Sequence, residues 1–136
     1  CIQVNNINQL PEFQHSDIII DAIFGTGLNR SIEGSIQKIV EYLNKLEDVL
    51  RIAIDIPTGL FADQANHEKD TIFQSHRVYT FHAPKLAFLL PQNGHYVNSF
   101  KVLDIRLSSE FTENTDGQLY YLEKSLEKYF TLLHSF

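Results

Sequence analysis

The sequence predicts an α/β fold built on a mostly parallel β-sheet. Two apolar runs, DIIIDAIFGTG (17–27) and RIAIDIPTG (51–59), each end in an acid and then in a glycine loop. Buried parallel strands are continuous runs of Ile, Val and Leu. The stretch between the two runs has the length and the periodicity of one helix. A strand, a helix and a strand in this order form a right-handed βαβ unit with parallel strands.

Composition narrows the class of protein. The 136 residues suffice for one domain with its own core. A formal net charge of −6, with scattered Lys and Arg, disfavours nucleic acid as a partner. No apolar run approaches the roughly 20 residues that span a membrane, so we expect a soluble protein with no membrane partner. The single cysteine, Cys1, fits the reducing cytoplasm, and the unpaired spacing of the six histidines disfavours zinc.

The first βαβ unit has its helix between the two glycine-ended strands. Residues 17–24 are predicted as a strand and residues 25–31 as a loop. Residues 50–56 are predicted as the second strand. Apolar residues between them recur at steps of three and four, which predicts one buried helix face: Ile32, Ile36, Ile39, Val40, Leu43 and Leu46.

The rest of the chain is predicted to alternate between loops and short strands. Residues 57–76 are polar and contain Pro57 and Gly59, so we expect a long loop with room for a short helix. The remaining predicted elements are a strand at 77–82, an apolar segment at 85–90, a turn at 91–94, a strand at 100–105, a linker from 108 and a helix at 119–136.

Both ends of the sequence differ from those of a complete doubly wound domain. Such a domain opens on a strand and a glycine-rich turn, whereas this chain opens on a polar segment. The predicted last helix reaches Phe136 without a glycine cap. We therefore expect that the N-terminal part of the domain is missing, and that 108–136 leads toward a further domain.

Asp21 is the first candidate site residue, because a carboxylate inside an apolar strand must be paired, hydrogen-bonded or bound to a cation. Thr58 follows the second strand and offers a hydroxyl oxygen near the same sheet edge. Oxygen ligands at this point suit an alkali or alkaline-earth cation. The alternative is an Asp that caps a neighbouring loop.

The loop after the first strand is a candidate phosphate-binding segment. Gly25 and Gly27 flank Thr26 and let the backbone approach a phosphate, and the following helix N-terminus would add positive charge. A tight strand-to-helix turn needs glycines as well, so GxG is a weak signal. The next residues can donate hydrogen bonds or present backbone N–H groups: Leu28, Asn29, Arg30 and Ser31.

Asp55 and Lys85 are the candidates for proton transfer. Asp55 ends the second strand and could act as a base or accept a hydroxyl proton, although an Asx turn would explain it equally. Lys85 follows the third strand and could meet a phosphate or donate a proton. A lysine at such an edge is more often simply solvated.

Taken in order, four segments resemble the NAD(P)H-hydrate epimerases, the family of the YjeF N-terminal domain. They are DAIFGTGLNR, AIDIPTGLFAD, TFHAPKLAFLLP and VLDIRL, and the resemblance runs from about residue 17 to residue 105. It implies a Rossmann-like three-layer α/β/α domain over 1–107, commonly dimeric, that interconverts the R and S forms of hydrated NADH and NADPH. It also implies a potassium ion as cofactor and a dehydratase partner, fused or separate.

Carried over by position, the resemblance assigns potassium to Asp21 and Thr58, with Thr58 replacing a serine in the family. It assigns the nucleotide loop to residues 25–31, the substrate-facing acid to Asp55 and the lysine of the family's APK segment to Lys85. A GNNGGDG-like segment of the family, which supplies an asparagine to potassium, is absent from these 136 residues. The alternatives are a non-catalytic dimeric scaffold, as in messenger-RNA decapping assemblies, and a generic nucleotide-binding domain.

Overall fold

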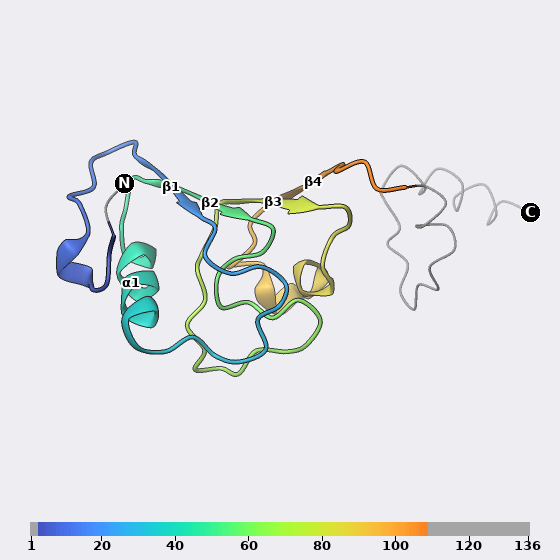
Figure 1. The fold of residues 1–136 in the computed structure, drawn as a ribbon, viewed down its shortest axis with the longest axis horizontal. Helices are drawn as coiled ribbons and strands as arrows, with labels where there is room; N and C mark the ends of the chain where they lie inside the picture. The colour runs from blue at the N-terminus through green and yellow to red at the C-terminus, as the bar shows by residue number, and fades with distance from the viewer. Residues whose placement is uncertain (1–2, 109–136) are drawn as a thin grey trace, which may run out of the picture. The chain divides into compact units, whose positions relative to one another are not determined.

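The computed structural model describes residues 3–108, which form a parallel four-stranded sheet with one α-helix (Figure 1). The predicted helix at 119–136 and nearly all of the predicted linker lie outside the described residues. The strands are hydrogen-bonded in sequence order, and all three pairings are parallel. The elements are β1 (Ile18–Asp21), α1 (Gly34–Asn44), β2 (Leu50–Ile54), β3 (Arg77–Phe81) and β4 (Phe100–Leu103). These features confirm the predicted α/β class.

The connections between strands differ in kind. The predicted helix joins β1 to β2, and its apolar face is buried as expected, with Val40 and Leu43 in the core. No helix forms in the long segment between β2 and β3, so the short helix considered there is wrong. Two short 3₁₀ helices, Leu86–Leu89 and Pro91–Asn93, connect β3 to β4 where an apolar segment and a turn were expected.

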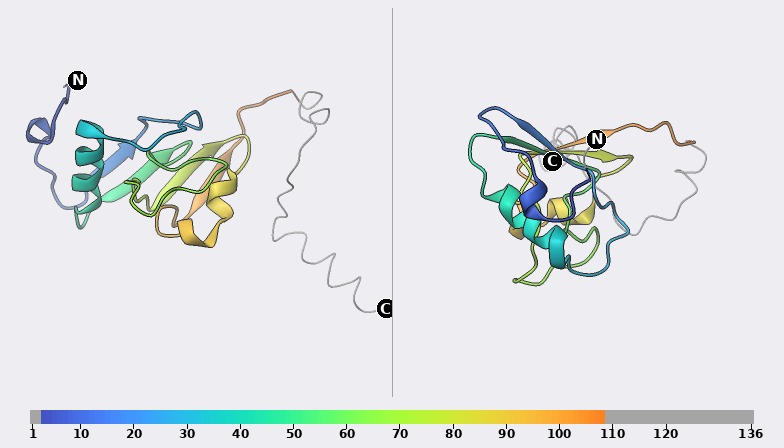
Figure 2. Two further views of the ribbon diagram at one scale, coloured as in Figure 1. Left: turned by 90° about the horizontal axis from the view of Figure 1, so that it is seen from below. Right: turned by 60° about the vertical axis from the view of Figure 1, so that its left-hand side comes forward.

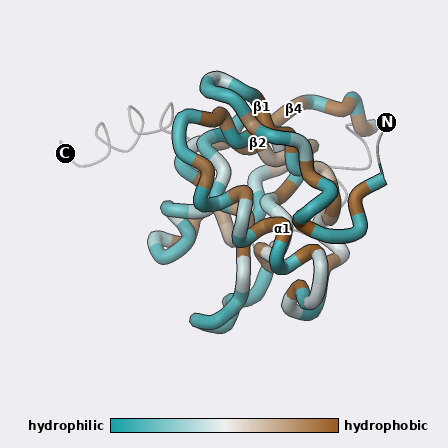
Figure 3. Tube along the Cα trace, turned by 90° about the vertical axis from the view of Figure 1, so that its left-hand side faces the viewer, coloured by the Kyte–Doolittle hydropathy of each residue, from teal (hydrophilic) through white to brown (hydrophobic). Residues whose placement is uncertain are grey.

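All three connections lie on one face of the sheet (Figures 1 and 2). Right-handed crossovers that step across a sheet in a single direction must all pass over the same face. This face carries the core, in which Ile19, Ala53 and Val78 are buried. The hydropathy view shows both apolar and polar residues along α1 (Figure 3).

The opposite face of the sheet is apolar and accessible over β1 and the start of β2, within residues 3–108. Side chains two apart on a strand share a face, and Ile18, Ile20 and Leu50 are 60%, 63% and 43% exposed. Parallel sheets are normally covered on both faces. The described residues thus form two layers, namely the sheet and the segments on its core face. The resemblance implies a third layer on the opposite face.

The strand register brings the candidate residues to one edge of the sheet. Asp21 is paired with Ala53 at the carboxyl ends of β1 and β2, so Asp55 follows only two residues further along. Asp55 and His82 both have φ of 66°, in the left-handed region that non-glycine residues seldom adopt. These turns take the chain away from the sheet at the edge where ligands bind in open parallel folds.

Candidate functional site

Asp21 and Thr58 are in direct contact, as the sequence predicted. The Asp21 carboxylate accepts two hydrogen bonds from Thr58, one from the backbone N–H at 2.7 Å and one from the hydroxyl at 2.6 Å. It also accepts a longer bond of 3.4 Å from the backbone N–H of Ile23. Both residues are buried, because the chain folds back over the end of β1 directly after Pro57. The contact joins the loops that follow β1 and β2.

Burial and hydrogen bonds determine the ionisation of Asp21. Burial raises the pKa of this carboxyl group, and the two hydrogen bonds from Thr58 oppose that effect. Within residues 3–108, no Lys, Arg or His forms an ion pair with Asp21. The same residues hold no cluster of three His, Cys, Asp or Glu side chains that would suit a transition metal. A single buried carboxylate beside a hydroxyl oxygen fits a cation that prefers oxygen ligands.

Asp55 and Lys85 form the second contact of the site. Lys85 Nζ lies 3.3 Å from Asp55 Oδ1, and the two side chains are only 18% and 21% exposed. The ammonium group also donates to the backbone carbonyls of Phe81 and Ala83, at 3.1 and 3.3 Å. These three acceptors hold Lys85 at the sheet edge. The alternative of a simply solvated lysine is therefore wrong. The lysine comes from the loop after β3, whereas the acid follows β2.

Gly25, in the candidate phosphate-binding loop, lies next to the carboxylate of Asp55. A Cβ placed on Gly25 would lie 3.2 Å from Asp55 Oδ2, a distance tighter than most real contacts. The close approach of loop and carboxylate therefore explains glycine at this position. Gly27 has no such neighbour within 4 Å, so its absent side chain is not required by packing against the described residues.

Thr80 belongs to the site and was not among the predicted residues. Its side chain is fully buried in β3, and its hydroxyl donates to Asp55 Oδ1 at 3.4 Å. A threonine within a strand is ordinary, so the sequence gives no signal of this role. Asp55 Oδ1 thus lies between a buried hydroxyl and an ammonium group.

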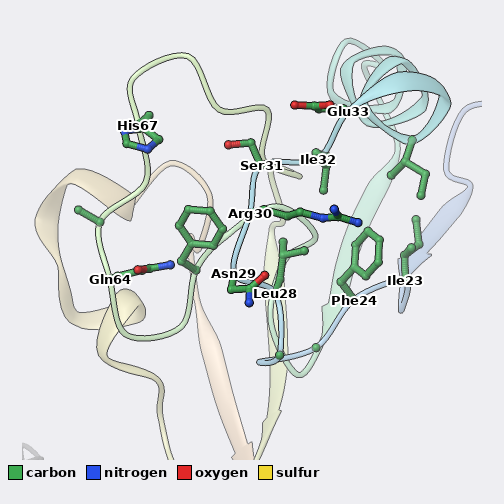
Figure 4. Close-up of a pocket in the computed structure, with 15 residues that line it drawn as sticks. Ile23, Phe24, Leu28, Asn29, Arg30, Ser31, Ile32, Glu33, Gln64 and His67 are labelled. Carbon is green, nitrogen blue, oxygen red and sulfur yellow. The ribbon is translucent and has the colours of Figure 1, made fainter.

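A cavity of about 1060 Å³ extends from this edge along the loop that precedes α1 (Figure 4). One wall is the segment from Ile23 to Glu33 with the exception of Thr26, and the opposite wall is the loop after β2. Figure 4 shows Gln64 and His67 on that second loop, across from Asn29 and Ser31. The second-wall residues were not predicted, because nothing in a polar loop reveals which segment it will face. They are Phe61, Gln64, Ala65 and His67.

One lining residue of the cavity, Gly25, lies next to the acid–lysine pair. Gly25 lines the cavity, and a Cβ added to it would lie 3.2 Å from Asp55 Oδ2, whereas Asp21, Asp55, Thr58 and Lys85 are not among the lining residues. The predicted site therefore forms two adjoining parts. One is a charged sheet edge, and the other is a larger cavity with polar and apolar walls.

The start of α1 departs from the prediction. The helix begins at Gly34, seven residues after Gly27, and its N-cap residue is Glu33, whose side chain forms no capping hydrogen bond. The helix N-terminus therefore borders the far end of the cavity, next to an acid, and does not lie beside the glycines. Any phosphate at Gly25–Gly27 would depend on loop N–H groups and Arg30 rather than on the helix dipole.

The chain matches a known family over more than half of its length. Residues 2–87 match the family described as YjeF-related protein N-terminus. No helix in the described part of the chain has the length and apolar character needed to cross a membrane.

Named relatives share this similarity. The chain is 33% identical over 106 residues to an NAD(P)H-hydrate epimerase of Leuconostoc citreum, covering 76% of this chain and 47% of the relative. It is 37% identical over 95 residues to an NAD(P)H-hydrate epimerase of Rhodopirellula baltica, covering 70% and 38%. It is also 38% identical over 74 residues to a bifunctional NAD(P)H-hydrate repair enzyme of Thermofilum pendens, covering 54% and 14%. The chain thus spans about half of these relatives or less.

Proposed function

Because this chain belongs to the YjeF-related N-terminal family, we propose that it carries the acid–base part of a site that interconverts the R and S forms of hydrated NADH and NADPH. The relatives named as NAD(P)H-hydrate epimerases support this reaction. The observation that carries the proposal is the Asp55–Lys85 ion pair at the carboxyl edge of the sheet. A scaffold or a generic nucleotide-binding domain would not require this pair.

The chemistry of the substrate suits an acid and a base held together. The hydroxylated C6 of a hydrated nicotinamide ring is a hemiaminal carbon. Asp55 would take the proton of the C6 hydroxyl, and the bond between C6 and the ring nitrogen would open to an aldehyde. Lys85 would give a proton to the released nitrogen. Closure on the other face of the aldehyde, with both proton transfers reversed, forms the other epimer.

The geometry supports this division of roles. Asp55 Oδ2 faces Gly25, where the absence of a side chain leaves room beside the carboxylate. Asp55 Oδ1 is held by Thr80 and Lys85. One carboxylate oxygen is therefore anchored, and the other faces the loop that borders the cavity. A positioned base of this kind contributes about 10²–10⁴-fold to a rate.

The cavity would hold the remainder of the dinucleotide. Its lining includes the predicted loop residues Gly25, Gly27, Leu28, Asn29 and Arg30. Backbone N–H groups and one guanidinium group can bind a diphosphate. Thr26 is next to this wall but does not line the cavity, so we assign it at most a backbone contact.

Potassium remains part of the proposal, with Asp21 and Thr58 as the residues of this chain that would hold it. Their buried oxygen atoms, and the lack of an ion-pair partner for Asp21 within residues 3–108, support a monovalent cation there. When bound, the ion would supply positive charge at the end of β1. The contact between Asp21 and Thr58 also holds together the loop that contains Gly25 and the loop that begins at Asp55.

The proposal extends to partners and location. A dehydratase that consumes one epimer is the expected partner, and the bifunctional name of the Thermofilum pendens relative supports it. We expect a homodimer in the cytoplasm, in line with the resemblance and with the single cysteine in the sequence.

The test is an assay of R-to-S conversion of hydrated NADH by the full-length protein in potassium buffer. Chromatography separates the epimers, and the expected result is a rate well above the spontaneous one. A rate equal to the spontaneous one, with a folded protein, would eliminate the epimerase. Parallel assays with hydrated NADPH would show which nucleotide is preferred.

A further inference from the structure

Ser31 and Asp70 form a hydrogen bond that connects the two walls of the cavity. Ser31 Oγ donates to Asp70 Oδ1 at 2.6 Å, and 39 residues separate the two positions. Ser31 belongs to the wall that follows β1, and Asp70 lies three residues after His67 on the loop that supplies the opposite wall. Asp21 and Thr58 join the same two loops at the sheet edge, and the Ser31–Asp70 hydrogen bond is a second connection between them, at the cavity.

Asp70 also organises its own loop. Its Oδ2 accepts the backbone N–H of His67 at 2.9 Å and the side-chain amide of Asn66 at 3.0 Å. The Asn66 side chain in turn donates to the Gly59 carbonyl and accepts the backbone N–H of Phe61. The shape of the loop that carries Phe61 and His67 therefore depends on one carboxylate.

We infer that Asp70 is a positioning residue, which fixes the second wall of the cavity and fastens it to the first wall through Ser31. The carboxylate accepts three hydrogen bonds from two separate segments, and both segments line the same cavity. Loss of the carboxylate would free the loop of Phe61 and His67 to move away from Arg30. The width of the cavity is thus set by a residue that does not line it.

This contact changes the role of Ser31. A hydroxyl group has one proton to donate, and Ser31 donates it to Asp70. A phosphate group at neutral pH only accepts hydrogen bonds, apart from a minor protonated form. Ser31 therefore cannot donate to a phosphate while the contact with Asp70 is intact. Arg30 and the loop N–H groups remain the donors on this wall.

The identity of the ligand rests on the proposed function: the two walls would enclose the nucleotide part of hydrated NADH or NADPH. Because Asp70 acts through the walls and not on the reacting carbon, its loss should change binding more than turnover. We expect Asp70→Asn to raise KM for hydrated NADH about five- to tenfold, the effect of one lost hydrogen bond of average strength. The kcat value should stay within twofold.

A double-mutant cycle distinguishes positioning from direct binding. Ser31→Ala should also raise KM, Ser31→Thr should retain the hydroxyl and the wild-type KM, and the double variant should be no worse than Asp70→Asn. If the two effects multiply, Ser31 contacts the substrate independently and the inference is wrong. Asp63→Asn is the matched control, since Asp63 is an exposed acid on the same loop that does not line the cavity.

Hydrogen exchange of the full-length protein without ligand tests the contact separately from the reaction. The backbone N–H groups of Phe61 and His67 should exchange faster in Asp70→Asn than in the wild type, and Asp63→Asn should leave them unchanged. Unchanged exchange in Asp70→Asn would overturn the inference. If the wild type lacks epimerase activity, the proposed function fails, whereas the exchange result still decides the role of Asp70.

Discussion

Asp55 Oδ1 lies 3.3 Å from Lys85 Nζ, although 30 positions separate the two residues in the chain. The pair forms because β2 and β3 are adjacent and parallel, so the loops after them leave the sheet at the same edge. The left-handed backbone at Asp55 turns the chain there. Strained non-glycine backbone of this kind is found preferentially at functional sites.

Replacement of either member of this pair should abolish most of the proposed activity. Asp55→Asn removes the base with little change in shape, so kcat should fall by about 10²–10⁴-fold. Lys85→Met keeps the length of the side chain and should also reduce kcat. Thermal unfolding of both variants serves as the folding control. Turnover within twofold of the wild type in Asp55→Asn would remove Asp55 from the mechanism.

Thr80→Val should lower activity while leaving the core packed. Valine has nearly the shape of threonine, but it lacks the hydroxyl that donates to Asp55 Oδ1. We expect kcat to fall about three- to tenfold, the range for one lost hydrogen bond of average strength. Thr80→Ser retains the hydroxyl and is the matched control. Equal loss in both variants would mean that packing and not the hydrogen bond matters.

Potassium should stabilise the protein through Asp21. A cation that binds only the folded state raises the melting temperature as its concentration rises. We expect KCl to raise the melting temperature of the wild type more than choline chloride does at equal ionic strength, and Asp21→Asn to lose this difference. A difference that persists in Asp21→Asn would place the potassium site elsewhere.

The contribution of Asp70 to stability should disappear in acid. Burial opposes its ionisation, but hydrogen bonds from Ser31, from the backbone of His67 and from Asn66 lower its pKa below the usual 3.8. A lowered pKa means that the contribution is complete above the unfolded-state pKa and is lost as pH falls through the folded-state value. The stability difference between wild type and Asp70→Asn should therefore be constant from pH 7 to about 5 and should shrink below pH 4. Urea unfolding measures it.

Gly59→Ala should destabilise the fold strongly. Gly59 has φ of 94°, and a Cβ there would lie 2.2 Å from the Thr71 carbonyl oxygen, which is backbone and cannot turn away. We expect a loss of at least about 2 kcal/mol in the free energy of unfolding. Gly27→Ala is the matched control, because its Cβ would meet no atom of the described residues within 4 Å and its φ is not positive.

The sequence was sufficient to predict the sheet and the edge at which Asp21, Thr58 and Asp55 gather. Continuous apolar runs predicted the parallel strands β1 and β2, and an acid that follows such a run must lie at its carboxyl end. The pairing of Asp21 with Thr58 follows from the sequence in this way, because the strand order of a single βαβ unit leaves few alternatives. The helix was predicted from its periodicity alone, although its start was placed too close to the glycines.

Tertiary structure decided what the loops do. Lys85, Thr80 and Asp70 acquire their roles from partners 25–39 positions away, and no local pattern encodes such contacts. The sequence by itself determined which residues end the strands, since strand propensity and burial are local properties. Only the folded chain decided that Ser31 meets the Asp70 carboxylate, because the path of a long polar loop depends on the surface against which it packs.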